Sequence, residues 1–195
     1  MMSLDSISLR MIEPLISGRS VLCLGYPEHP SGVDTVRWMR ENGAVKVDVI
    51  DIIAHRGIER IVDLNNENAW PHRCDLVINP GTLEHCFNIG VAWANAWRPL
   101  TAGGYVMHVM PATMLNHGFW NVSPVAIEDW CAANGGHVVD MEFAINGTRK
   151  QVGKRPLPAG SSGRGFLPPE TVMYALCRKD RELPITWPAQ GVYRQ

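Results

Sequence analysis

Short apolar runs that alternate with helical segments constrain the fold of this chain more than any other feature. The runs at 20–25 and 74–78 are mostly apolar, and each is followed by a loop that contains glycine and proline. Strands of this kind are typical of a parallel sheet that helices cover on both faces. Segment 4–16 differs, because its apolar residues recur mostly every three or four positions, which predicts an amphipathic helix.

The same alternation continues along the chain. The expected strands are 20–25, 45–52, 58–64, 74–78, 105–110, 137–145 and 171–178, and the expected helices are 4–16, 33–42 with a capping box at Ser31 and Asp34, one capped by Thr82, and one that begins at Ser123–Pro124 and ends near 134. Alternating strands and helices imply parallel βαβ crossovers. The last two strands have no helix between them, which favours an antiparallel pair. The sequence therefore predicts an α/β fold: a Rossmann-like, doubly wound, mostly parallel seven-stranded sheet with a C-terminal antiparallel hairpin.

Length and charge limit the other possibilities. We expect 195 residues to form one domain, 1–195, with an N-terminal helix in 1–18 and a long basic loop, rich in glycine and proline, in 146–169. The net charge of −1 gives no general reason to expect nucleic acid as a partner. No apolar run approaches the roughly 20 residues that span a bilayer, and the N-terminus does not resemble a secretory signal. We therefore expect no membrane partner and a cytoplasmic protein.

In an open α/β sheet, ligands bind outside the carboxyl ends of the strands. After the first four expected strands the chain places, in order, Gly25-Tyr26-Pro27, Asp51, Asp63-Leu64, and the loop 79–85. We therefore expect a binding site that these four loops form together.

The segment from Cys74 to His85, followed at helix length by 97–106, resembles the class I S-adenosylmethionine-dependent methyltransferases. In that family a D-x-V and L-E-H segment, a helix, and an R-x-L and G-G segment lead into the fifth strand; the similarity here extends over roughly 20–145. The resemblance implies the fold stated above, S-adenosylmethionine as cofactor, and methyl transfer to oxygen or nitrogen of a small-molecule or sugar acceptor.

The resemblance also implies roles for single residues. Asp51 matches the acidic residue that binds the ribose hydroxyls, and Asp63 and Leu64 match the adenine contacts. The remaining candidates for cofactor binding are Gly25, Tyr26 and Pro27 in the first loop and Asn79, Gly81 and Glu84 near the sulfonium. As alternatives, Asp51, Asp63 and Leu64 are ordinary strand-end residues, and Asn79 to Glu84 are a loop before a capped helix.

The first loop departs from the family pattern, which has an acidic residue and a G-x-G run. Here only Gly25 remains, the acidic position is apolar, and Pro27 lacks a backbone N–H. Glu28 is the nearest carboxylate that could replace the acidic residue. This departure leaves a second hypothesis open, in which the chain is a non-catalytic binding or scaffold subunit with a homo-oligomeric or other protein partner.

Histidine is the side chain that titrates nearest neutral pH, so it suits removal of a proton from an acceptor. The candidates for a catalytic base are His85, which follows the family-like Leu-Glu, and His117, in the loop after the fifth strand. Surface or core roles are the alternative for both. We expect no metal site, because the seven histidines show no H-x-x-x-H or H-E-x-x-H spacing.

Two features concern the acceptor. Phe119 and Trp120 either wall the acceptor pocket or fix their loop to the core. The basic residues of the 149–164 loop either attract an anionic acceptor or are simply solvated; these are Arg149, Lys150, Lys154, Arg155 and Arg164.

Overall fold

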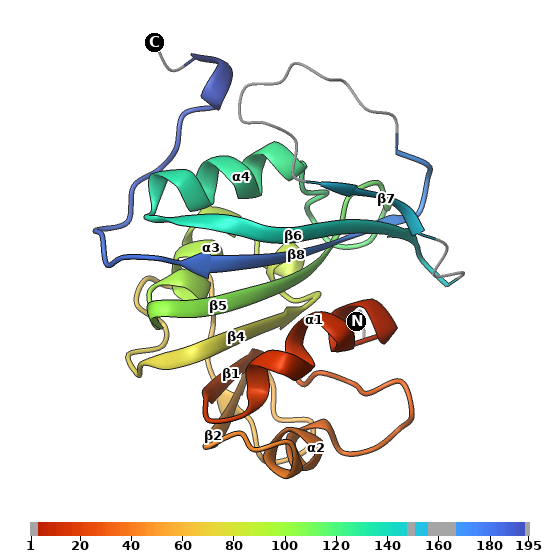
Figure 1. Cartoon of the computed structure of the whole chain (residues 1–195), viewed down its shortest axis with the longest axis vertical. Helices are drawn as coiled ribbons and strands as arrows, with labels where there is room; N and C mark the ends of the chain where they lie inside the picture. The colour runs from red at the N-terminus through yellow and green to blue at the C-terminus, as the bar shows by residue number, and fades with distance from the viewer. Residues whose placement is uncertain (1–3, 148–150, 156–166, 194–195) are drawn as a thin grey trace.

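Eight strands pair side by side in one sheet in the computed structural model of the chain, which describes residues 4–147, 151–155 and 167–193 (Figure 1). The strands are β1 Ser20–Leu24, β2 Lys46–Asp51, β3 Arg60–Ile61, β4 Cys74–Pro80, β5 Leu100–Pro111, β6 Gly136–Ile145, β7 Gln151–Arg155 and β8 Thr171–Lys179. Their order across the sheet is β3-β2-β1-β4-β5-β8-β6-β7.

The sheet has a parallel half and an antiparallel half. Strands β3, β2, β1, β4 and β5 run parallel to one another. Strand β8 runs antiparallel to both β5 and β6, between which it lies. The predicted fold class is confirmed, including the antiparallel pair of β6 and β8.

The segment 146–169, predicted as one long loop, contains the short strand β7, which pairs antiparallel with β6. The prediction is therefore wrong for Gln151–Arg155, and the sheet has an eighth strand. Strand β7 lies at the edge of the sheet, where charged residues are common because they discourage further pairing. An edge strand of this polar composition lacks the apolar run that marks the inner strands.

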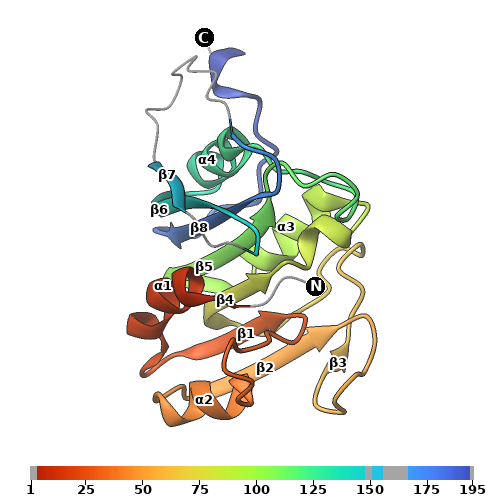
Figure 2. The ribbon, with the colours of Figure 1, turned by 90° about the vertical axis from the view of Figure 1, so that its right-hand side faces the viewer.

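Helices cover both faces of the sheet. Helices α1 Ser6–Ile16 and α2 Thr35–Glu41 pack on one face, and α3 Ile89–Trp97 and α4 Pro124–Ala133 on the other. Figure 2 shows α1 and α3 on opposite sides of the sheet. Each face has its own buried cluster: Ile12, Val36 and Met39 belong to one, and Trp97 and Trp130 to the other. The doubly wound arrangement follows from these two clusters.

Two helix starts differ from the prediction. Ser31 contacts the ring nitrogen of His29, and Asp34 alone caps α2 by accepting from the N–H of Arg37. Thr82 precedes only a short 3₁₀ helix, η1 Leu83–His85, and Asn88 caps α3. The Thr82 hydroxyl donates instead to the carbonyl of Leu24.

Strand order reverses between β1 and β4; in open α/β sheets the region outside the carboxyl ends of the strands at such a point, here called the crevice, is where ligands bind. The loops that follow β1, β2 and β4 meet there. None of the helices in the described residues combines the length and the apolar character needed to cross a membrane.

Candidate active site

Gly25 brings the loops after β1 and β4 into close contact. Its φ is +77°, a left-handed conformation that favours glycine. A Cβ atom added there would lie 2.6 Å from the Thr82 hydroxyl oxygen and 3.7 Å from Oδ2 of Asp51. The structure thus places Gly25 and Asp51, two of the predicted cofactor residues, beside Thr82 at one end of the crevice.

Asp51 ends β2 with one carboxylate oxygen fixed and the other directed toward Gly25. Its Oδ1 accepts from the N–H of Ile52 at 2.7 Å and of Ile53 at 3.4 Å. This anchoring orients Oδ2, the oxygen near Gly25. A carboxylate held in this way can accept hydrogen bonds from paired hydroxyl groups such as those of a ribose.

Arg56, which the sequence analysis did not select, contacts the loop after β1. Tyr26 is buried, and the guanidinium of Arg56 lies 4.0 Å from the centre of its ring. Arg56 also forms an ion pair with Glu28. Glu28 is therefore engaged with a neighbouring loop. Pro27 lies between the two contacts and supplies no backbone donor. Because these contacts join separate loops, no local sequence pattern reveals them.

Asp63 has a local partner, whereas Leu64 belongs to the core. Oδ1 of Asp63 accepts from the backbone and side-chain nitrogens of Asn65 at 2.9 and 2.8 Å, an arrangement typical of a turn. The Leu64 side chain is buried in the core, and its carbonyl accepts from Asn95. The Leu64 side chain therefore packs inward, which does not favour the expected contact with the adenine.

The Asn79 side chain fixes the loop after β4. It is fully buried, and its Oδ1 accepts from the N–H of Thr82 at 2.9 Å and of Leu83 at 3.2 Å. Its Nδ2 lies 3.3 Å from Nδ1 of His108, whose pKa burial lowers to about 4. Gly81, at φ +89°, completes the turn. Asn79 thus fixes the backbone of the loop after β4, and this backbone borders the crevice.

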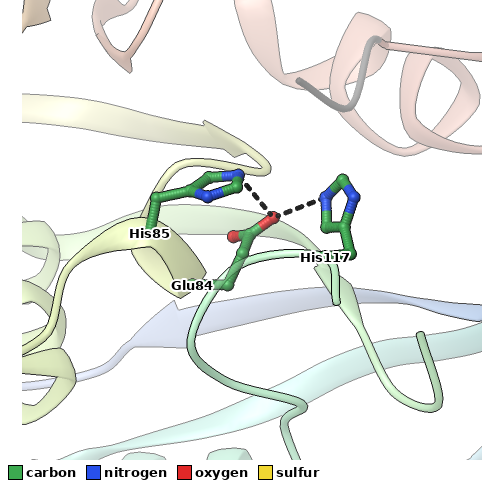
Figure 3. Close-up of side chains that lie close together, drawn as sticks. All are labelled: Glu84, His85 and His117. Carbon is green, nitrogen blue, oxygen red and sulfur yellow. Dashed lines mark ion pairs between the residues drawn. The ribbon is translucent and has the colours of Figure 1, made fainter. Parts of the chain in front are cut away.

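Beyond this turn, Glu84, His85 and His117 form a cluster (Figure 3). Oε1 of Glu84 lies 3.6 Å from Nε2 of His117 and 4.0 Å from Nε2 of His85, and the two rings are 5.4 Å apart. The Glu84 side chain is fully buried, whereas His85 and His117 are partly exposed. Sequence analysis selected all three residues, and the structure brings them together.

Burial governs the electrostatics of this cluster. It raises the pKa of Glu84 to about 7. It also lowers the pKa of His117 and of His85, and for His85 the neighbouring His117 adds to the effect. Both imidazoles therefore favour the neutral form, in which one ring nitrogen can accept a proton.

His117 reaches the cluster because its loop packs tightly on η1. Gly118 has φ +79°, and a Cβ there would lie 2.9 Å from the Glu84 carbonyl oxygen. The N–H of Phe119 donates to that oxygen at 2.9 Å, and the indole N–H of Trp120 donates to the carbonyl of Cys86 at 3.1 Å. The turn signal Asn116-His117-Gly118 is visible in the sequence, but its partner is not.

Aromatic side chains border the cluster. Phe87 and Phe119 are exposed, with ring centres 5.5 Å apart, and Phe87 also lies 6.4 Å from Trp120. Trp120 fixes its loop through the bond to Cys86, in line with one of its two expected roles. The exposed Phe87 and Phe119 form an apolar rim next to His85 and His117.

Comparison with solved structures identifies the fold. TehB from Haemophilus influenzae matches 90% of this chain with a TM-score of 0.58 at 11% identity, and StiE O-MT matches 90% with a TM-score of 0.55 at 16% identity. A Thermotoga maritima S-adenosylmethionine-dependent methyltransferase, a possible histamine N-methyltransferase, aligns with 89% of this chain over 87% of its own length with a TM-score of 0.43 at 11% identity, and the fold assignment does not rest on it.

The chain spans 62% of the length of TehB and 72% of StiE O-MT. No protein-family model matches the sequence, and a search of curated proteins gives no significant match. The structural neighbours are S-adenosylmethionine-dependent methyltransferases. The chain therefore has the fold of the class I S-adenosylmethionine-dependent methyltransferases, as the sequence resemblance predicted.

Proposed function

We propose that the chain transfers a methyl group from S-adenosylmethionine to oxygen or nitrogen of a small-molecule or sugar acceptor. The observation that carries this proposal is that the candidate cofactor residues lie near the cluster of Glu84, His85 and His117. Gly25 and Asp51 adjoin Thr82 in the crevice, and Glu84 and His85 directly follow the same β4 loop. The candidate cofactor residues and the candidate proton acceptors thus adjoin the same loop.

Two residues of the crevice suit the cofactor. Gly25 lets the loops after β1 and β4 meet, because a side chain there would collide with Thr82, and Asp51 presents an oriented carboxylate oxygen beside it. We assign the ribose hydroxyls to Asp51, the adenine to Asp63, and the methionine part to the Gly25 and Gly81 loops. When bound, S-adenosylmethionine supplies a methyl group on a positively charged sulfur.

The chain's own contribution is positioning and removal of a proton. Methyl transfer is an in-line displacement, and positioning supplies much of its rate. A hydroxyl acceptor must also lose its proton. His85 and His117 lie at the open side of the cluster and favour the neutral form, so we propose them as proton acceptors.

The first test is calorimetric titration of the full chain with S-adenosylmethionine and S-adenosylhomocysteine. We expect micromolar binding of both, followed by turnover when small-molecule and sugar acceptors are screened. The closed first loop, with Tyr26 beneath Arg56, favours the alternative of a non-catalytic binding subunit. Absence of binding up to millimolar cofactor would reject the methyltransferase function and favour that alternative.

A further inference from the structure

The three side chains of the cluster supply the ligand types of a transition-metal site. Their ligand atoms, one carboxylate oxygen and two imidazole nitrogens, all lie within 4.8 Å of one another. Bonds from such atoms to Zn²⁺ are about 2.0 to 2.2 Å long, so ligand atoms around one ion lie about 3 to 3.5 Å apart. The separations from Glu84, 3.6 and 4.0 Å, exceed this range only slightly.

The second observation is that buried polar atoms of the cluster lack hydrogen-bond partners. Both carboxylate oxygens of Glu84 and Nε2 of His117 are buried and have no hydrogen-bond partner among the described residues. Buried polar atoms in proteins are nearly always paired, so three adjacent exceptions require an explanation. A cation between them would satisfy the carboxylate and the imidazole together.

One side of the cluster is buried in the protein, and the other side is exposed to solvent. Glu84 has 0% of its side chain exposed, whereas His117 has 24% and His85 has 46%. Three protein ligands with one open side are typical of catalytic metal sites, in which the remaining positions take water or substrate. Imidazole and carboxylate ligands suit Zn²⁺, Fe²⁺ and related ions better than Ca²⁺ or Mg²⁺.

We propose that Glu84, His85 and His117 bind one divalent transition-metal ion, of the Zn²⁺ or Fe²⁺ class, with open positions for an oxygen atom of the methyl acceptor. The metal site stands independently of the proposed function, whereas the role of the acceptor oxygen rests on it. With the ion bound, the two histidines are its ligands, and this role replaces that of proton acceptor proposed for them above. A hydroxyl acceptor then loses its proton to water, because coordination lowers its pKa.

This proposal replaces the expectation of no metal site, which rested on histidine spacing along the chain. Spacing rules describe ligands on one helix or one loop. Here one histidine belongs to η1 and the other to the loop after β5. The close approach of Gly118 to the Glu84 backbone joins them.

The test is a titration of the full chain, without a histidine tag and stripped of metal by chelator, with Zn²⁺ by calorimetry and with Co²⁺ by visible absorption. The five cysteines are free and buried, so they do not compete for the ions in the folded protein. We expect one ion per chain. Glu84→Gln and His117→Ala should each weaken binding at least about tenfold, since even outer-shell changes have effects of that size.

The exposed His55 provides a matched control, and His55→Ala should bind the ion like the unaltered chain. Near-ultraviolet circular dichroism checks that each variant is folded, and Glu84→Gln preserves side-chain volume. No binding, or equal binding by all variants, would overturn the metal site. S-adenosylhomocysteine affinity is measured in parallel, so that failure of the cofactor site and failure of the metal site are separate results.

Discussion

Gly25 is the residue at which a single added atom would most disturb the crevice. Its backbone is left-handed, and its neighbour across the crevice is the Thr82 hydroxyl, which is already bonded to Leu24. Gly32 offers a comparison, because its φ of +74° is almost the same and nothing lies within 4 Å of an added Cβ.

We predict that Gly25→Ala lowers the free energy of unfolding by about 2 to 5 kcal/mol, about 1 to 2 from the left-handed backbone and the rest from overpacking against Thr82. Gly32→Ala should cost only about 1 to 2 kcal/mol. Urea unfolding followed by circular dichroism measures both. Equal costs at the two positions would show that the Thr82 contact relaxes freely.

Asp51 allows a direct test of cofactor binding. We predict that Asp51→Ala weakens S-adenosylhomocysteine binding by about 1 to 3 kcal/mol, the range for hydrogen bonds to a charged group. Asp48 is the control, because it lies on the same strand, points to the other face and pairs with Lys46 at 2.6 Å. Calorimetry should show unchanged affinity for Asp48→Ala, and unchanged affinity for Asp51→Ala would remove this residue from the site.

Sequence position predicted which residues lie near the crevice better than it predicted their contacts. Position at the carboxyl end of a strand is readable from hydrophobic pattern, which is why Gly25, Asp51 and His85 were selected. Asn79 was selected for a ligand contact, whereas its side chain turns inward to hold the loop. Such partners depend on how two loops pack, and the residues around one position do not encode that.

At the scale of elements, β4 and β5 are joined by a buried polar contact beside the crevice. Asn79 and His108 occupy paired positions of these strands, and His108 is almost fully buried. Burial alone lowers the pKa of His108 from 6.5 to about 4. Protonation of this histidine therefore opposes folding.

We predict that the protein loses about 3 kcal/mol of stability from His108 as the pH falls from about 6.5 to about 4. In this window the unfolded chain binds the proton and the folded chain does not, so the contribution is complete above 6.5 and is lost as the pH falls through 4. Urea unfolding across pH should show a shallower dependence for His108→Gln than for the unaltered chain. The exposed His55→Gln is the control, and parallel curves for all three proteins would contradict the prediction.

Elements with strong local signals were predicted closely. Helix α4 begins at Pro124 and ends at Ala133, close to the expected limits, because Ser123, Pro124 and Gly135 mark its ends. Strand β3 is only Arg60–Ile61, shorter than the expected 58–64, since it pairs on one side with the end of β2 alone. The edge strand β7 was missed because its residues are polar. Both differences from the prediction follow from the place of β3 and β7 at the edges of the sheet.

At the scale of the whole molecule, contacts distant in sequence fix α1 to the far half of the sheet. Asp5 caps α1 by accepting from the N–H groups of Ile7 and Ser8, and its second oxygen accepts from the Tyr174 hydroxyl of β8 at 2.5 Å. The buried carboxylate of Asp5 thus accepts hydrogen bonds from both the start of α1 and strand β8.

We predict that Asp5→Ala lowers the free energy of unfolding by about 2 to 4 kcal/mol, since it removes a helix cap and leaves the Tyr174 hydroxyl without this acceptor. Asp34→Ala is the matched control, because Asp34 caps α2 at an exposed position, and about 0.5 to 2 kcal/mol is expected there. Chemical denaturation compares them. A cost for Asp5→Ala no larger than that for Asp34→Ala would assign it a capping role alone.

The expected anionic acceptor depends on where the basic residues of the 149–164 segment lie in the molecule. Arg149, Lys150 and Arg164 lie outside the described residues, and Lys154 and Arg155 belong to β7. In sheet order β7 lies four strands beyond β4. At about 4.8 Å per strand, strands β4 and β7 are about 19 Å apart across the sheet. An anionic acceptor therefore stays a prediction.

The place of β8 in the sheet has a consequence for how the chain is made. It is the last strand in chain order, yet it lies between β5 and β6. While the ribosome is still synthesising the segment before Thr171, β5 has an open apolar edge and the pair β6–β7 has nothing to join. Completion of the sheet therefore follows release of β8 from the exit tunnel. Until then the nascent chain exposes the unpaired edges on which chaperones and proteases act.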